Sequence, residues 1–312
     1  MPENEAGRGR ASIHSIDHFA LNVPSIDEAE RFFRSFGLRV ERDGGGAPEL
    51  ALYAADGHRW ARILAADHKS LAYLSFNAYA ADLDALYAQV AATGRTVLHD
   101  RSSDGFWFRD PDGNLVQVKV GPKTSPSAKT PCHLDGSPAD TRGSHTRSQA
   151  QTVHPRRLSH VLLFTPDVLR ALDFYHATLG LRLSDKSQDL IAFTHAPHGS
   201  DHHLVAFAKS SARGWHHAAW DVDDVNSVGE GAAQMAAAGY TKGWGTGRHV
   251  LGSNYFHYVE DPWGSFCEYS ADIDFVSAGA QWPAGDYDPE DSLYLWGPAV
   301  PDNFIRNTEL TA

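Results

Sequence analysis

The sequence predicts an α+β fold of four βαβββ modules, arranged as two homologous halves. Its 312 residues suffice for two domains, because one domain takes roughly 100–200 residues. Residues 16–40 and 158–183 share one pattern, in which an apolar strand run with a central histidine, a proline and an amphipathic stretch precede Gly-Leu-Arg. Residues 110–113 and 261–264 both read Asp-Pro-x-Gly, a turn composition between strand-like runs. Internal repeats of this kind indicate duplicated modules.

Within each half, a strand, a helix and several short strands follow one another twice. Pro24 and Pro166 stand just before the first helix of each half, and a glycine follows each second helix within two residues. The expected helices are residues 25–33, 81–92, 167–175 and 225–238, and the clearest expected strands are 215–222 and 254–259.

These patterns divide the chain into four segments. We expect an N-terminal domain at 12–120, a linker or surface excursion at 121–156, a C-terminal domain at 157–271, and a tail at 272–312 that packs on the C-terminal domain. The linker is rich in Ser, Thr, Pro and Gly without periodicity, so we expect solvated side chains for its histidines His133, His145 and His154. The apolar residues 294–296 of the tail are expected to be buried at a pocket mouth.

Composition and charge exclude several classes of protein. The chain has 27 Lys and Arg against 39 Asp and Glu, a net charge of −12, and no basic patch, so nucleic acid and anionic lipid would repel it. It has no run of about 18 apolar residues and no apolar N-terminal stretch, so we expect no membrane span and no signal peptide. Two cysteines, Cys132 and Cys267, cannot form a disulfide framework, which favours a cytoplasmic location.

Three polar residues of the second half interrupt apolar strand runs. His160 lies in a first strand, His217 ends a His-His pair, and Glu268 follows the second Asp-Pro-x-Gly turn. Each alone could be a hydrogen-bonded core residue, but two imidazoles and one carboxylate on matching strands are the ligand set of the non-haem Fe(II) facial triad. Strand alternation is expected to turn Cys267 and His216 to the opposite face.

At these residues the second half resembles the catalytic half of a two-domain type I extradiol ring-cleavage dioxygenase. That family belongs to the vicinal oxygen chelate superfamily, and the likeness is to its catechol 2,3-dioxygenase, or metapyrocatechase, branch. Its metal ligands are a first-strand His, the second His of a His-His pair and a Glu after the last turn. These match His160, His217 and Glu268, which the resemblance therefore implies to be the metal ligands.

The resemblance extends to residues around the triad. His203, in Asp-His-His-Leu, matches the acid–base histidine of the family. His249, in Gly-Arg-His, matches the histidine that contacts a substrate oxygen, and Tyr258 matches the tyrosine that hydrogen-bonds the ring hydroxyl. One departure is Val-Leu-Gly-Ser at residues 250–253, where the biphenyl-diol branch carries Asn-Asp, and it argues against a biphenyl-type substrate.

The resemblance implies two vicinal-oxygen-chelate domains, of which the C-terminal one is catalytic. It implies Fe(II), with Mn(II) as the alternative, a catecholic substrate and O2, and a product of the 2-hydroxymuconic semialdehyde type made in aromatic-compound degradation. It also implies a homo-oligomer and neither a nucleic-acid nor a membrane partner. Two other members of the fold remain alternatives: a glyoxalase-like isomerase and a metal-free binding protein of the bleomycin-sequestering kind.

The first half lacks the candidate ligands. Aligning the halves by their shared turns places His18, Tyr73 and Gln117 opposite the His, His and Glu of the second half, in that order. A lone imidazole with a phenol and a neutral amide lacks the charge and the second imidazole that Fe(II) prefers. We therefore expect the first half to bind no metal.

Overall fold

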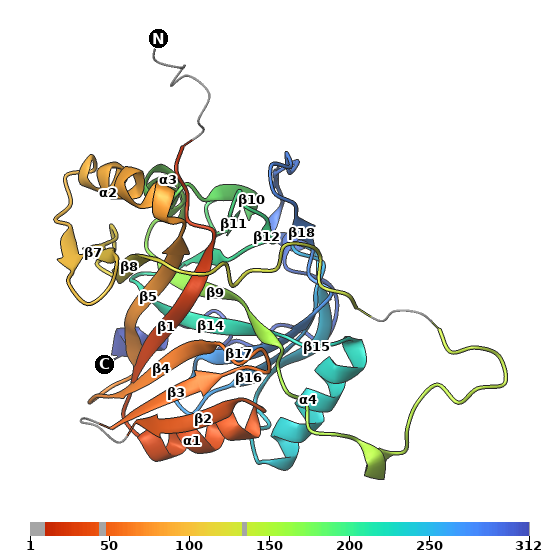
Figure 1. Cartoon of the computed structure of the whole chain (residues 1–312). Coiled ribbons are helices and arrows are strands. Elements are labelled where there is room, and N and C mark those ends of the chain that lie inside the picture. Colours follow the sequence, from red (N-terminus) through yellow and green to blue (C-terminus); the bar gives the residue numbers. More distant parts are fainter. Residues whose placement is uncertain (1–9, 44–47, 133–135, 312) are drawn as a thin grey trace.

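The computed structural model describes residues 10–43, 48–132 and 136–311, and most of its strands belong to two large sheets (Figure 1). The first half of the chain forms an eight-stranded sheet in the order β2-β3-β4-β1-β5-β8-β7-β6. Its strands are β1 (Ser15–Val23), β2 (Arg39–Asp43), β3 (Glu49–Tyr53), β4 (Arg59–Ala65), β5 (Ser70–Ala78), β6 (Leu98–Asp100), β7 (Gly105–Arg109) and β8 (Leu115–Val120).

The second half forms a ten-stranded sheet in the order β19-β10-β11-β13-β9-β14-β17-β16-β15-β20. Its strands are β9 (Arg157–Thr165), β10 (Arg182–Ser187), β11 (Ile191–His195), β13 (Val205–Lys209), β14 (Gly214–Asp221), β15 (Gly243–His249), β16 (Tyr255–Glu260), β17 (Phe266–Ala271), β19 (Gly285–Asp286) and β20 (Tyr294–Trp296). The short strands β12 (Ser200–Asp201) and β18 (Phe275–Val276) pair with each other.

Strand pairing confirms the four βαβββ modules. In each module the first strand pairs in parallel with the last, as β1–β4, β5–β8, β9–β13 and β14–β17. The first strands of the two modules in each half pair antiparallel, β1 with β5 and β9 with β14. The module helices are α1 (Ile26–Ser35), α2 (Leu83–Ala91), α3 (Val168–Leu179) and α4 (Val225–Ala237).

Local side-chain chemistry fixes the helix ends. Ser25 and Asp167 cap α1 and α3 by accepting hydrogen bonds from the backbone N–H groups three residues later, at 3.2 and 3.0 Å. Helix α3 runs four residues beyond the expected end at residue 175 and stops at Gly180, whose φ of +68° is the left-handed conformation that ends many helices.

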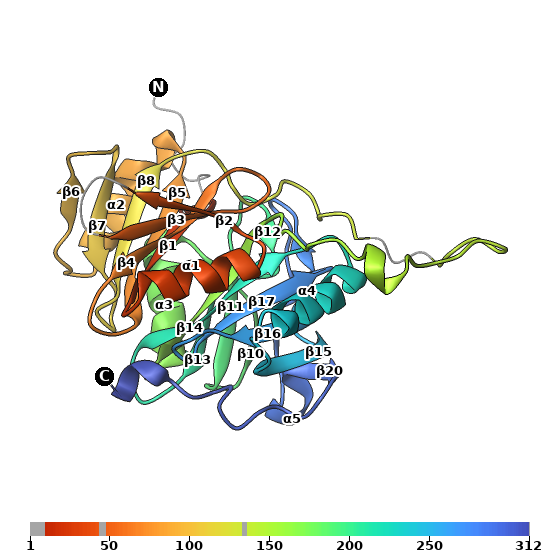
Figure 2. The same ribbon diagram turned by 90° about the horizontal axis from the view of Figure 1, so that it is seen from below.

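The two halves pack through their helices and a shared core. The C-terminal end of α1 lies next to α4 (Figure 2), where Gln234 of α4 donates a hydrogen bond to the carbonyl oxygen of Ser35 at 2.7 Å. Tyr269 of β17 stacks on Phe36 with ring centroids 4.0 Å apart and donates its hydroxyl to the Phe36 carbonyl. Gly231 allows this approach, because a Cβ there would lie 2.8 Å from the Tyr269 ring.

The tail adds strands to the second sheet, whereas much of the linker lies away from both sheets. Residues 136–152 project away from both sheets (Figures 1 and 2), while the tail adds β19 to one edge of the second sheet and β20 to the other. His145 and His154 are exposed as expected, although His145 pairs with Glu230 and His154 contacts the Gly37 carbonyl. His133 lies outside the described residues. No helix in the described ranges is long and apolar enough to cross a membrane.

Candidate metal centre and active site

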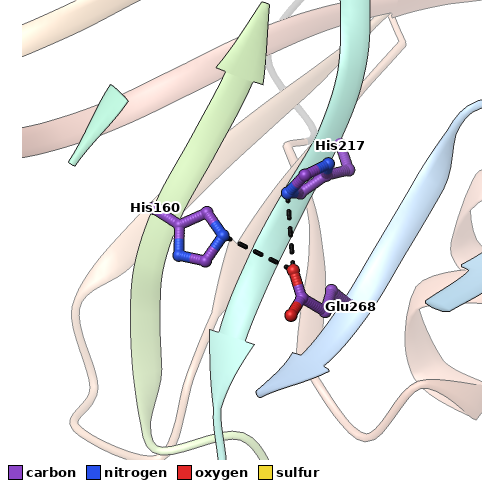
Figure 3. Close-up of side chains that lie close together, drawn as sticks. All are labelled: His160, His217 and Glu268. Carbon is purple, nitrogen blue, oxygen red and sulfur yellow. Dashed lines mark ion pairs between the residues drawn. The ribbon is translucent and has the colours of Figure 1, made fainter. Parts of the chain in front are cut away.

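Three adjacent strands bring His160, His217 and Glu268 onto one face of the second sheet. On the central strand β14, Ala219 lies opposite both His160 of β9 and Glu268 of β17. His217 precedes Ala219 by two residues and therefore points to the same face. Both imidazole Nε2 atoms lie 3.4 Å from the same carboxylate oxygen, Oε2 of Glu268, and Figure 3 shows both rings directed at it.

The donor atoms of this cluster fit a metal ion. One ligand atom from each residue lies within 4.8 Å of the others, and all three side chains are buried. Nε2 of His217 and Oε2 of Glu268 are buried without a hydrogen-bond partner, which is costly unless a ligand occupies the space between them. The three donor atoms therefore face one shared space, and two imidazoles with one carboxylate are a donor set that suits a divalent transition-metal ion.

Asn254 orients the carboxylate and was not foreseen from the sequence. Its side-chain amide donates to Oε1 of Glu268 and to the hydroxyl of Ser270, both at 2.9 Å. The hydrogen bond occupies Oε1 and leaves Oε2 facing the two imidazoles. In the sequence, Asn254 stands immediately before the apolar run of β16. Asparagine is common in turns, so its position alone does not indicate a contact with Glu268, although the structure buries it.

The expectation that His216 points away from His217 is wrong. A β-bulge shifts the β9–β14 register between Trp215 and His217, so simple alternation fails there. The Nδ1 atoms of the two histidines lie 2.6 Å apart, and Nε2 of His216 donates to the carbonyl oxygen of Phe304 at 2.7 Å. Burial lowers the pKa of His216 to about 4, so the ring is neutral near pH 7.

Cys267 follows the alternation that was expected. It faces the hydrophobic core on the other side of β17 from Glu268. Burial raises the pKa of its thiol well above the usual value, so it is neither a ready nucleophile nor a thiolate ligand.

His203, His249 and Tyr258 lie around the same cavity as the cluster. The His203 ring packs on that of His160 with centroids 3.9 Å apart. Nε2 of His249 accepts a hydrogen bond from the hydroxyl of Tyr258 at 2.9 Å, and this Nε2 lies 4.0 Å from Oε1 of Glu268. The three side chains that the sequence placed around the triad are therefore brought together.

Burial dominates the electrostatics of these groups. It lowers the pKa of His203 well below the usual value, and the neighbouring imidazoles, first His160, lower it further. It also raises the pKa of Tyr258 well above 10, with the Glu268 carboxylate adding to the rise. A neutral imidazole and a protonated phenol therefore face the cavity in the metal-free chain.

The cavity has a polar end and an apolar body. Its volume is about 290 Å³, and histidines from three strands and one loop form the polar end. The body is formed mainly by apolar side chains of the sheet and the tail, including Leu162, Phe193, Leu251, Leu293 and Phe304.

Residues 294–296 of the tail were expected to be buried at the mouth of the cavity, but other tail residues line it. Leu295 and Trp296 are 67% and 45% exposed, so they are not buried at the pocket mouth. Strand β20 instead pairs with β15 at the sheet edge, and the large apolar side chains that the tail contributes to the cavity wall are those of Leu293, Phe304 and Ile305.

The first half carries a hydrogen-bonded network at the equivalent positions. Ser75 of β5 lies opposite both His18 and Gln117, as Ala219 lies opposite His160 and Glu268, and this register confirms the expected alignment. The two nitrogens of His18 contact Asp17 and Tyr73, at 2.6 and 2.9 Å, and Gln117 donates to Asp100 at 2.8 Å.

Comparisons with known proteins agree with this geometry. A family model described as the Glyoxalase/Bleomycin resistance protein/Dioxygenase superfamily matches residues 15–118 and again 157–269. The chain is 65% identical over 308 residues to Metapyrocatechase 2 of Cupriavidus necator, covering 97% of this chain and 95% of that protein.

Solved structures show the same two-sheet fold. The Mn(II)-bound glyoxalase of Novosphingobium aromaticivorans has 25% sequence identity and a TM-score of 0.74, over 94% of each chain. An extradiol ring-cleaving dioxygenase of B. fuscum has 19% identity and a TM-score of 0.74, over 98% of this chain and 85% of that one. At 19% identity, the second likeness concerns the fold alone.

Proposed function

Since the chain belongs to the Glyoxalase/Bleomycin resistance protein/Dioxygenase superfamily, we propose that it is an extradiol dioxygenase of the metapyrocatechase kind. It opens the aromatic ring of a catechol beside the diol with O2, giving a product of the 2-hydroxymuconic semialdehyde type. The observation that carries this proposal is the buried cluster of two imidazoles and one carboxylate, in which Nε2 of His217 and Oε2 of Glu268 face each other without a hydrogen-bond partner.

His160, His217 and Glu268 are the proposed ligands of one Fe(II) ion, with Mn(II) as the alternative. Two neutral imidazoles and one carboxylate on one side of an ion are the ligand set of the non-haem Fe(II) oxygenases and leave the opposite positions open. When bound, the ion supplies a site where the diol oxygens and O2 meet, and it lowers the pKa of the diol hydroxyls. The amide of Asn254 keeps the Glu268 carboxylate turned toward this site.

Three further residues act on the substrate. Tyr258 and His249, joined by their 2.9 Å hydrogen bond, orient the ring oxygens and stabilise negative charge on them. His203 lies beside His160 at the cavity wall and moves a proton to and from the reacting oxygens, for which its neutral ring supplies a free lone pair. The apolar body of the cavity excludes water around the ring.

The cavity favours a single-ring catechol with small apolar substituents. Its volume of about 290 Å³ lies at the lower end of the range for small-molecule sites, about 300–1,000 Å³. Lys209 is the one lysine or arginine among the described lining residues, and it pairs with the exposed Asp189. A carboxylate on the ring would lose its hydration in the cavity without gaining a buried cation.

Oxygen uptake distinguishes this function from the two alternatives. The metal-free chain is loaded with Fe(II) without air and mixed with catechol in air-saturated buffer. We expect one O2 consumed for each catechol, together with the yellow absorbance of the ring-opened product. A glyoxalase-like isomerase or a metal-free binding protein consumes no O2, so an iron-loaded chain that binds catechol without uptake would refute the proposal.

A further inference from the structure

Two His-His pairs at the cavity have the same hydrogen-bond arrangement. In His202-His203 and in His216-His217, the Nδ1 atoms of the two rings face each other, at 3.0 and 2.6 Å. The Nε2 atom of the first ring in each pair faces an oxygen, which is Oδ2 of Asp185 for His202, at 2.8 Å, and the Phe304 carbonyl for His216, at 2.7 Å.

These contacts determine where the ring protons lie. A carbonyl or carboxylate oxygen only accepts, so the first ring of each pair carries its proton on Nε2. When the first ring is neutral it has one proton, which leaves its Nδ1 as an acceptor. The second ring must then donate from its own Nδ1, and its Nε2 keeps a free lone pair. In His217 this Nε2 is the atom that faces Glu268 without a hydrogen-bond partner.

Groups of the tail provide or hold the oxygens in both cases. The Phe304 carbonyl belongs to the tail itself. Asp185 belongs to β10, and its carboxylate accepts hydrogen bonds from the backbone N–H of Gly285, at 2.7 Å, and from the indole of Trp282, at 3.3 Å. The tail also holds the proton of a third cavity histidine on Nδ1. Here no second ring intervenes, because Nδ1 of His249 donates directly to the Leu293 carbonyl at 2.6 Å.

We infer that His202 and His216 are positioning residues that fix the tautomers of His203 and His217, and that the tail segment 282–304 supplies or orients the acceptors that control them. The acceptors keep the Nε2 lone pairs of His203, His217 and His249 free of ring protons. The use of these lone pairs rests on the proposed function, whereas the tautomers themselves do not.

The two positioning residues affect different steps. His216 acts through a metal ligand, so its loss leaves the Nδ1 proton of His217 buried without an acceptor and lets the ring turn or change tautomer. Outer partners of metal-bound histidines typically contribute a factor of about 10–100 in metal affinity or activity. His202 acts through His203, which does not belong to the ligand cluster, so its loss affects proton transfer and leaves metal affinity unchanged.

The tautomers are measured directly on the metal-free wild-type chain. Its histidines are labelled with ¹⁵N, and the shifts of the two ring nitrogens report which one carries the proton, with assignment by single substitutions. We expect protons on Nε2 of His202 and His216, and on Nδ1 of His203, His217 and His249. A proton on Nε2 of His203 or His217 overturns the inference, whatever the chain catalyses.

Substitutions then separate positioning from packing. His216→Phe should weaken Co(II) binding by about 10–100-fold, and His216→Asn should recover most of it because the amide oxygen can accept near the position of Nδ1. His202→Phe should keep Co(II) affinity and lower kcat with catechol, again with recovery in His202→Asn. The matched control is His257→Phe. His257 is a half-buried imidazole of β16 whose Nδ1 is buried without a partner, and it does not line the cavity.

Each outcome bears on the inference. Wild-type Co(II) affinity in His216→Phe contradicts the role of His216, and equal losses of affinity in His202→Phe and His216→Phe indicate general damage to the sheet. If His257→Phe weakens Co(II) binding to the same degree, packing explains the effect and the inference fails. Absence of ring cleavage in the wild-type chain would refute the proposed function and leave the tautomer assignment standing on the ¹⁵N shifts.

Discussion

Lys69 of the first half reaches into the second half and donates a hydrogen bond to the carbonyl oxygen of Trp215, at 3.3 Å. Its ammonium also contacts the hydroxyl of Ser265 and lies 3.5 Å from the carboxylate of Glu309. Trp215 is two residues before His217, and Ser265 is three before Glu268. One buried lysine therefore joins the starts of the two parallel strands that carry two proposed ligands, and it also joins them to the end of the tail.

Lys69→Met is expected to lower the free energy of unfolding. The substitution leaves the nearly buried Glu309 carboxylate without its cation, and breaking a buried ion pair from one side costs about 3–5 kcal/mol. Urea unfolding of the metal-free variant measures this loss. Lys129→Met is the control, because Lys129 is half exposed in its pair with Asp272 and such pairs contribute about 1 kcal/mol or less. Equal effects of the two substitutions would show that the buried contacts of Lys69 contribute no more to stability than a surface ion pair.

Removal of any one proposed ligand should abolish iron binding. Glu268→Gln replaces a charged oxygen donor by a neutral amide, and His160→Ala or His217→Ala removes an imidazole nitrogen. Metal analysis after anaerobic loading measures the occupancy, and circular dichroism checks the fold. Glu260→Gln is the matched control, because Glu260 lies outside the cavity and accepts a hydrogen bond from Asn303. Full iron occupancy in all three ligand variants would exclude the assignment.

His203→Gln should separate binding from chemistry. The substitution leaves the three proposed ligands and Tyr258 in place, so iron content and catechol binding should persist. Turnover should fall by roughly 10²–10⁴, the range for loss of a positioned acid–base group. Anaerobic catechol titration and oxygen uptake measure the two quantities separately. Turnover equal to that of the wild type would assign the proton transfer to another group.

His14 should make the folded state sensitive to acid. Its burial lowers its pKa to about 4, with a further contribution from His198, and its Nε2 is buried without a partner. In the unfolded chain a histidine titrates at about 6.5. Between these values the unfolded chain binds more protons, so the stability contributed by neutral His14 is complete above about pH 6.5 and is lost as the pH falls toward 4.

His14→Phe is therefore expected to reduce the difference in unfolding free energy between about pH 7.5 and pH 5. Urea unfolding at the two pH values measures it. His145→Phe is the control, since His145 is exposed and should leave the difference unchanged. An unchanged difference in His14→Phe would mean that other buried histidines account for the acid sensitivity.

The sequence was sufficient to predict the modules and the cluster of three candidate ligands, because both depend on local side-chain patterns. The His160 strand, the Asp-Pro-x-Gly turns and the ligand types are readable residue by residue. The orientation of His216 was not, because it depends on a bulge that a neighbouring strand imposes on β14. The role of the tail was hidden for another reason: it acts through the backbone carbonyls of Leu293 and Phe304, and every residue has a carbonyl.

The last prediction is that iron binds at one site per chain. In the first half, the nitrogens of His18 are both engaged, by Asp17 and by the hydroxyl of Tyr73. Gln117 at the position of Glu268 is a neutral amide that donates to Asp100 and accepts from Ser75. An ion there would displace hydrogen bonds that the protein already makes and would gain one imidazole without a carboxylate at the third position.

Anaerobic Fe(II) titration of the metal-free chain tests this count. We expect an endpoint near one ion per chain, unchanged in His18→Ala and lost in His160→Ala. The two substitutions are matched, since His18 of β1 and His160 of β9 occupy equivalent positions in the two halves. Because the two halves share one register, the comparison isolates the chemistry of the side chains from the shape of the sheet. An endpoint near two ions, with the second lost in His18→Ala, would show that both halves bind metal.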